Sequence, residues 1–275
     1  MARSLVALAV GLALGMAGAI TQSTARNALA SPDVLGITMG AAAAAVIAIG
    51  YGSVGTNSPV LIPAVAIMGG ALTAALILLL ARGAGGQTYR MVLIGIGVNS
   101  MLGSVVSFIL VNAASDTAAM ATLWLTGSVN GRGMAQFVPV MVVLLVVCLL
   151  VLPTARDLSP LQLGESSASS LGVDVSRRRL LLLVAAVVLT AVAVAAAGPV
   201  AFVAFVAPQL AVRLQATAHP PLVGSAVCGG VLVLVADLVA RVLLPWELPV
   251  GVVTAAIGGP FLLYVLVTRR RRTTL

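Results

Sequence analysis

The sequence predicts an all-α fold, a polytopic bundle of about nine transmembrane helices that occupies residues 1–275 as a single domain. Three observations support this prediction. The chain is 61% hydrophobic and only 8% charged, with a mean hydropathy of +1.18, whereas a water-soluble surface needs far more charge. Its apolar residues form runs of about 20, the length a helix needs to cross roughly 30 Å of hydrocarbon. These runs are apolar on every side, which excludes the alternating strands of a membrane barrel.

We expect nine crossings, at approximately 4–22, 34–52, 59–81, 91–112, 134–152, 180–197, 199–214, 222–244 and 248–268. The first contains Gly11-x-x-x-Gly15, a spacing that suits close helix packing. The seventh is short, follows a Gly-Pro pair and contains Pro208. We therefore expect it to be broken or tilted and to rely on its neighbours for backbone hydrogen bonds.

The first run also has the form of a cleavable signal peptide. Arg3 precedes an apolar stretch that ends at the small residues Ala17-Gly18-Ala19. Both interpretations, crossing helix and signal peptide, stay open at this point.

The arginines predict the orientation of the bundle, and all 15 cations of the chain are arginine. If the N-terminus is outside, the inner loops hold twelve of them: Arg26, Arg82, Arg90, Arg156, Arg177, Arg178, Arg179, Arg213 and Arg269 to Arg272. The outer side then holds three: Arg3, Arg132 and Arg241. This bias predicts a C-terminus in the cytoplasm.

The absence of lysine excludes several enzyme classes. A phosphate-binding P-loop and Schiff-base chemistry both require a lysine. His219 is the only histidine, which argues against a histidine-built zinc site or catalytic base. We therefore expect no catalytic residue, no metal site and no cofactor on this chain.

The loop 153–179 is the longest between predicted crossings, and its residues are typical of helix ends. Ser159, Pro160 and Gln162 form an N-cap, first-turn proline and capping-box pattern, and a second short helix can run from Glu165 to a stop at Gly172. Two short amphipathic helices would offer an inner docking surface for a partner. A re-entrant or surface-lying loop is the alternative.

The fourth crossing carries a stripe of small and hydroxyl residues: Gly97, Ser100, Ser104 and Ser107. Their spacing places them on one helix face. We interpret the stripe as the lining of a transport pathway, since polar intramembrane faces usually look inward. The alternative is that each serine forms a hydrogen bond between helices.

Five segments in order resemble one family: 17–41 (AGAITQSTARNALASPDVLGITMGA), WLTGS at 124–128, LGESSASSLGVDVSRRR at 163–179, AGPVAFVAFVAPQLAVRL at 197–214, and 236–266. They are similar to the permease subunits of the iron-chelate (siderophore), haem and cobalamin ABC importers, the FecCD-like type II importers. The likeness covers essentially the whole chain. It implies a ten-crossing fold, a dimer around a central pathway and two ATPase subunits bound through the long inner loop. It begins at the family's second helix, so either the gene start is misplaced or this member is naturally short.

The resemblance assigns residues to three roles. It implies that the residues in contact with the ATPase are Leu161, Leu163, Gly164, Glu165, Ala168, Leu171 and Gly172. It implies that Arg3 and Arg241 bind acidic residues of a substrate-binding protein. The alternative for Arg241 is a local pair with Asp237, one helical turn earlier. It also places the serine stripe on a helix that lines the family's pathway.

Three departures from the family pattern fall near the inner face. The segment similar to the family's cytoplasmic gate reads Asn27-Ala28-Leu29, where the family usually has proline second, so its rigidity is expected to differ. Gln209 stands where the family generally has histidine. His219 lies in a loop that departs from the family pattern, and we expect it to be a loop residue without a functional role.

The resulting hypothesis is a permease subunit of an ATP-driven importer in the cytoplasmic membrane, with ATP and magnesium bound by its partner. The expected partners are ATPase subunits, an extracytoplasmic binding protein, a second permease subunit and membrane lipid, with no nucleic acid. The alternative is a stand-alone secondary transporter, which would need a coupling carboxylate deep in the membrane, and Asp237 is the one candidate. The sequence leaves open the chelate (siderophore, haem or cobalamin) and the choice between a homodimer and a heterodimer.

Overall fold

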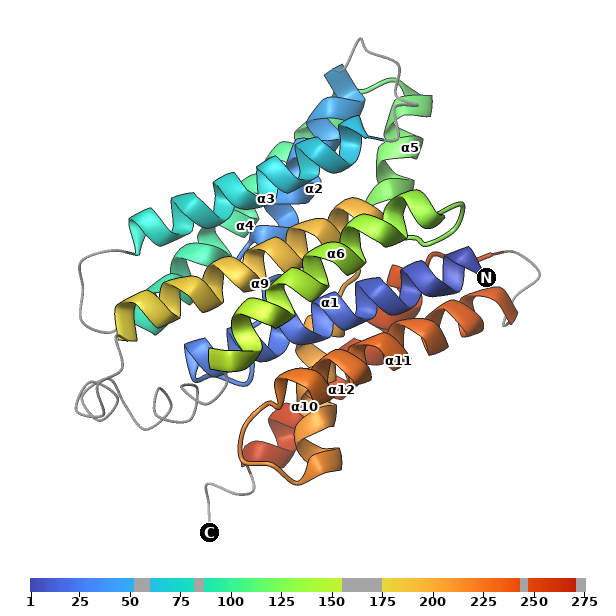
Figure 1. Cartoon of the computed structure of the whole chain (residues 1–275). Coiled ribbons are helices and arrows are strands. Elements are labelled where there is room, and N and C mark those ends of the chain that lie inside the picture. The colour runs from blue at the N-terminus through green and yellow to red at the C-terminus, as the bar shows by residue number, and fades with distance from the viewer. Residues whose placement is uncertain (52–59, 82–86, 155–174, 243–246, 271–275) are drawn as a thin grey trace.

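The computed structural model describes residues 1–51, 60–81, 87–154, 175–242 and 247–270, and all regular elements in these ranges are helices (Figure 1). They are α1 (Ala2–Ala25), α2 (Ile37–Tyr51), α3 (Leu61–Leu80), α4 (Gln87–Asn112), α5 (Ser115–Leu125), α6 (Met134–Val151), η1 (Leu152–Thr154), α9 (Val175–Ala197), α10 (Val203–Gln215), α11 (Leu222–Val242) and α12 (Val250–Arg270). The predicted all-α bundle is confirmed.

Each of the nine predicted segments coincides with a helix, but their lengths differ. Six helices of the described part, α1, α3, α4, α6, α9 and α11, are long and apolar enough to cross a membrane. The helix α2 and the apolar part of α12 are shorter. The sequence analysis missed α5, an 11-residue helix between α4 and α6. The predicted number of nine crossings therefore stays a prediction.

The helix α1 lies at the centre of the bundle, between α6 and α11 (Figure 1). About 78% of its most apolar stretch is buried, with Val6, Val10 and Leu14 among the core residues. Its predicted close packing is confirmed, because a Cβ atom on Gly11 would lie 2.3 Å from the carbonyl oxygen of Gly229 on α11. Thus α1 is an integral helix of the bundle, as the crossing interpretation predicts.

The predicted seventh segment is short, as expected, but α10 is one continuous helix, so the predicted break is not found. The chain leaves α9 at Gly198 (φ +74°) and enters α10 at Phe202 (φ +66°), so α10 is only 13 residues long. Pro208 inside α10 has no N–H to donate to the preceding turn. A neighbouring helix also contacts the main chain of α10, because Gln22 Nε2 of α1 donates to the Phe205 carbonyl at 3.1 Å.

Main-chain contacts join three segments at one end of the bundle. The Ser128 amide donates to the Ala197 carbonyl at 2.7 Å, and the Gly251 amide donates to the Gly127 carbonyl at 3.0 Å. Gly127 has φ +70°, and a Cβ there would lie 2.0 Å from the Pro199 carbonyl oxygen, so glycine is required. This glycine junction brings together segments 124–128, 197–200 and 249–251, which belong to three separate motifs of the sequence.

Large apolar side chains cover the outside of the helices α3, α4 and α6. Leu72, Val111 and Leu149 are strongly exposed, and only 17% of the most apolar stretch of α4 is buried. Such surfaces are stable against hydrocarbon or against another apolar subunit, but not against water.

Candidate pathway and docking end

A cavity of about 1100 Å³ lies between the loop after α1, the face of α4 and the segment that leads into α10. Its lining includes Ser100, Ser104 and Ser107 of the predicted stripe, together with Asn99 and Gly103. Gly97, the fourth member of the predicted stripe, does not line it. The polar face of α4 therefore borders an open space, as a pathway requires.

The serine hydroxyls of α4 do not join helices. Ser100 Oγ donates to the Ile96 carbonyl at 3.0 Å, and Ser104 Oγ donates to the Ser100 carbonyl at 3.1 Å, both within α4. Within this chain, these two serines form their hydrogen bonds inside α4 and not to another helix. A hydroxyl that bonds its own preceding turn keeps its outer lone pairs for water or a solute in the cavity.

Asp33, which the sequence analysis did not single out, is the one ionisable residue among the described residues that line this cavity. It lies in the loop between α1 and α2 and accepts a hydrogen bond from Thr38 Oγ1 at 2.5 Å. Burial raises the pKa of the Asp33 carboxyl, and the Thr38 bond acts in the opposite direction. One signal could have found it, since Asp33 is the one carboxylate in the polar stretch after the first predicted crossing.

The predicted gate, Asn27-Ala28-Leu29, forms an ordered turn although it lacks the family's proline. The helix α1 ends at Arg26 in the left-handed region (φ +48°), and the Asn27 amide donates to the Gln22 carbonyl at 3.2 Å. Asn27 Oδ1 accepts from the Leu29 amide at 3.0 Å, which is the bond of an Asx turn. Side-chain and cap bonds thus hold this turn without the proline ring.

Gln209 of α10 connects the gate to α1. Its Nε2 donates to Gln22 Oε1 at 2.5 Å and is 3.5 Å from the Ala28 carbonyl, and both amide side chains are buried. The sequence analysis noted Gln209 only as a departure from the family and missed Gln22. Neither residue has a sequence signal of its own, because the pairing joins residues 187 positions apart.

Two further cavities lie at this end of the bundle, which the arginine bias predicts to be the inner end. One of about 270 Å³ is bordered by Gln22, Asn27, Ala28 and Gln209, and another of about 720 Å³ is bordered by the loop between α10 and α11. His219 belongs to that loop, is exposed, and accepts a bond from Thr217 Oγ1 through its carbonyl. Its predicted position in a loop is confirmed.

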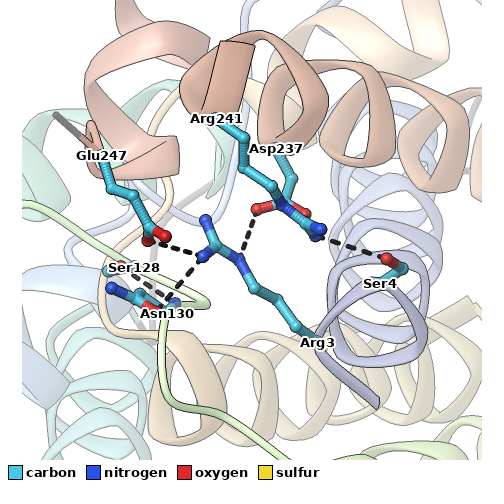
Figure 2. Close-up of polar contacts among 7 residues, drawn as sticks. All are labelled: Arg3, Ser4, Ser128, Asn130, Asp237, Arg241 and Glu247. Carbon is cyan, nitrogen blue, oxygen red and sulfur yellow. Dashed lines mark hydrogen bonds and ion pairs between the residues drawn. The ribbon is translucent and has the colours of Figure 1, made fainter. Parts of the chain in front are cut away.

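At the opposite end, Arg3 is held by three side chains from distant parts of the chain (Figure 2). Its Nε donates to Asp237 Oδ1 at 2.9 Å. Its Nη1 donates to Glu247 Oε2 at 2.7 Å and to Asn130 Oδ1 at 3.2 Å. The start of α1, the end of α11, the loop before α6 and the segment before α12 therefore meet at one guanidinium group.

Arg241 completes this cluster, which we call the outer ion cluster because the arginine bias predicts that this end faces outward: Arg3, Asp237, Arg241 and Glu247. Arg241 Nη2 bonds Asp237 Oδ2 and reaches Ser4 Oγ at 3.3 Å (Figure 2). The alternative of a local pair with Asp237 is confirmed. The side chains differ in exposure, with Asp237 at 2%, Arg3 at 15%, Arg241 at 35% and Glu247 at 52%.

The predicted ATPase contacts lie outside the described residues. They are Leu161, Leu163, Gly164, Glu165, Ala168, Leu171 and Gly172. The two short helices expected between Ser159 and Gly172 fall in the same range. Both stay predictions.

Comparison with known proteins decides the family. The model of the FecCD transport family matches residues 1–268, almost the whole chain. The chain belongs to the FecCD transport family. Because the family match starts at residue 1, it includes the buried helix α1 of this FecCD member.

Individual FecCD relatives agree with this assignment. The chain is 42% identical over 271 residues to the ferric enterobactin transport system permease protein FepG of Escherichia coli (strain K12), covering 98% of this chain and 81% of that protein. It is 35% identical over 281 residues to the hemin transport system permease protein HmuU of Yersinia pestis, covering 98% and 82%.

A solved structure agrees as well. A chain of a metal-chelate type ABC transporter in an inward-facing conformation superposes with a TM-score of 0.86 at 29% identity, covering 97% of this chain and 86% of that one. This FecCD protein is thus a multi-pass membrane protein and a permease subunit of an ABC importer. The sequence-based family prediction is confirmed, and the permease hypothesis is supported over a stand-alone secondary transporter.

Proposed function

We propose that this FecCD permease carries an iron chelate across the cytoplasmic membrane, driven by ATP that separate partner subunits hydrolyse. The cavity of about 1100 Å³ carries this proposal, because it is large enough for a chelate-sized solute and is lined by hydroxyl and amide groups on an otherwise apolar bundle. The relatives named above act on iron-chelate and haem cargoes, which supports the same class of substrate here.

Three partners follow from this proposal. A substrate-binding protein docks at the outer ion cluster, through Arg3 and Arg241. ATPase subunits bind the inner loop at 161–172. A second permease subunit packs against the exposed face of α4 and closes the pathway, because that face combines the cavity lining with apolar side chains such as Phe108, which is 63% exposed.

The proposed orientation has the N-terminus outside and the C-terminus in the cytoplasm. The arginine bias supports this orientation. The fold supports it too, because residues predicted to lie on the same side of the membrane lie at the same end of the bundle. Arg3 and Arg241 lie at one end of the bundle, whereas Arg26 borders a cavity at the other end with His219. Cysteines placed near Arg132 should react with an impermeant thiol reagent from outside. Reaction only from the inside would reverse the orientation.

We also propose that this chain has no ATPase activity and binds no cofactor, with ATP and magnesium held by the partner. The absence of lysine supports this, because a P-loop requires one. Asp237, the candidate coupling carboxylate of a secondary transporter, is instead paired with two arginines.

The test is reconstitution of the permease in liposomes with its ATPase and with the chelate-loaded binding protein inside. Export of the chelate from the lumen should require external ATP and both partners. Transport driven by an ion gradient without the ATPase would instead support a secondary transporter.

Gly172→Val tests the inner loop within the same system. Valine disfavours the left-handed conformation by about 1 kcal/mol or more, so the predicted helix end should be distorted. We expect weaker co-purification of the ATPase and loss of transport, with detergent melting nearly unchanged. Gly133→Val is the matched control, since a Cβ at Gly133 meets open space at the outer end. Wild-type transport by Gly172→Val would place coupling elsewhere.

A further inference from the structure

The positive and negative charges of the outer ion cluster balance one another. Two arginines face two carboxylates, so the cluster as it stands offers no net positive charge to an acidic partner. This conflicts with a simple docking role for Arg3, whose side chain is only 15% exposed and already has two anionic partners. The third nitrogen of the Arg3 guanidinium, Nη2, has no hydrogen-bond partner in the described structure but is buried, so a docking protein cannot reach it. Docking through Arg3 therefore requires that a partner of Nη1 be replaced.

Geometry distinguishes the replaceable partner from the fixed one. Asp237 is 2% exposed and is shared by Arg3 Nε and Arg241, so its removal would leave buried charge. Glu247 is 52% exposed, lies in the segment before α12, and contacts only the outer nitrogen Nη1 of Arg3. An exposed ion pair of this kind contributes little to stability and can open at small cost.

We infer that Glu247 occupies the place on Arg3 that a carboxylate of the substrate-binding protein takes when it docks. Docking is then an exchange of one carboxylate for another at Arg3 Nη1, while Asp237 keeps the guanidinium oriented (Figure 2). This rests on the proposed docking role of the outer end. The inference adds two points to that role. Glu247 is the residue that competes with the binding protein, and the binding protein must present an acidic side chain at its surface.

Asn130 provides a matched control, because it accepts a bond from the same Nη1 atom without carrying a charge. Glu247→Gln removes the competing charge and leaves a net positive charge at the outer end, which raises both affinity and association rate for an acidic partner. Asn130→Ala removes one neutral contact. The exchange therefore predicts tighter binding for Glu247→Gln and no change for Asn130→Ala, although both residues bond the same Nη1 atom.

The experiment measures binding of the purified binding protein to the permease–ATPase complex in nanodiscs, at low and high salt. Glu247→Gln should bind about fivefold more tightly at low salt, mostly through faster association, and the gain should shrink at high salt. Asn130→Ala and Glu247→Asp should bind like the wild type. Melting in detergent identifies any variant that is merely misfolded, and Glu247→Ala then provides a second neutral variant.

Two results separate failure of the exchange from failure of the docking proposal. If Arg241→Ala weakens binding but Glu247→Gln and Glu247→Ala leave it unchanged or weaker, Glu247 supports docking instead of competing with it, and the exchange is wrong. If Arg241→Ala and Arg3→Gln both bind normally, the outer ion cluster is not the docking surface, and the proposed function loses this partner site.

Discussion

The two ends of the bundle, which we propose to face outward and inward, are stabilised by different interactions. At the outer end, two arginines and two carboxylates from distant segments form a closed ion cluster around the nearly inaccessible Asp237. At the inner end, the neutral amides of Gln22 and Gln209 connect α1, α10 and the gate, and cavities of about 270 and 720 Å³ lie beside them.

This difference indicates which end can rearrange. A buried charge that loses its partner costs several kcal/mol, whereas a neutral amide bond contributes about 1 kcal/mol. Empty volume at the inner end also leaves room for side chains to move. We therefore expect the ion pairs of Asp237 to persist during transport, and the amide contacts of the inner end to rearrange more readily. The following predictions test this contrast.

The largest expected effect is that of Asp237→Asn. It leaves Arg3 and Arg241 without their shared buried partner, and we expect a loss of about 3 kcal/mol of stability, read as a large drop in the detergent melting temperature. Asp116→Asn, on the exposed side of α5, is the control and should melt like the wild type. An unchanged melting temperature for Asp237→Asn would mean that the ion pairs of Asp237 do not stabilise the outer end.

A second effect concerns the space between the two ends. Ser104→Leu fills part of the cavity wall, so ATP-driven transport should fall about tenfold or more, an effect of roughly 1.4 kcal/mol on the barrier. Stability should change little, because Ser104 is exposed and bonds only its own helix. Ser104→Ala keeps the cavity open and should transport normally. Normal transport by the leucine variant would place the pathway elsewhere.

Gln209→Ala tests the inner end. It removes the amide bond to Gln22 and should lower stability by about 1 kcal/mol, less than Asp237→Asn. A cysteine placed at Ala28 should then react faster with a thiol reagent from the inner side, because the gate turn loses its connection to α10. Gln215→Ala changes an exposed amide of the same helix and serves as control. Equal reactivity in both backgrounds would count against Gln209 as part of the gate.

The smallest expected effect is a pH dependence at Asp33. Because its pKa is raised in the folded protein, the folded state binds the proton more tightly, and stability is lost as the pH rises through the raised pKa. Asp33→Asn should therefore melt slightly higher than the wild type at pH 8, with the difference vanishing near pH 4. Thr38→Val removes the bond that lowers the pKa and should steepen the loss. The reverse pH trend would show that the carboxylate is stabilised by the fold.

The sequence predicted the positions of the helices better than the contacts between them. Hydropathy located every long helix, since burial in hydrocarbon requires a continuous apolar run, and Arg241 with Asp237 followed from helical spacing alone. The helix α5 was missed because it is too short to give a hydropathy signal. The pairs Arg3 with Glu247 and Gln22 with Gln209 join residues far apart in sequence, and only packing brings them together. The sequence did not predict that Asp33 borders a cavity, because that position follows from the fold.

The glycine junction also explains what kind of information the family motifs contain. Gly127, Gly198 and Gly251 are required because carbonyl oxygens of neighbouring segments stand where their Cβ atoms would lie. Such a requirement is the same whatever solute passes through the bundle. The motifs that make the chain recognisable therefore encode architecture and are silent about cargo, so permeases for different chelates can share them. A preference of the permease for one cargo would have to come from other residues, such as those that border the cavity.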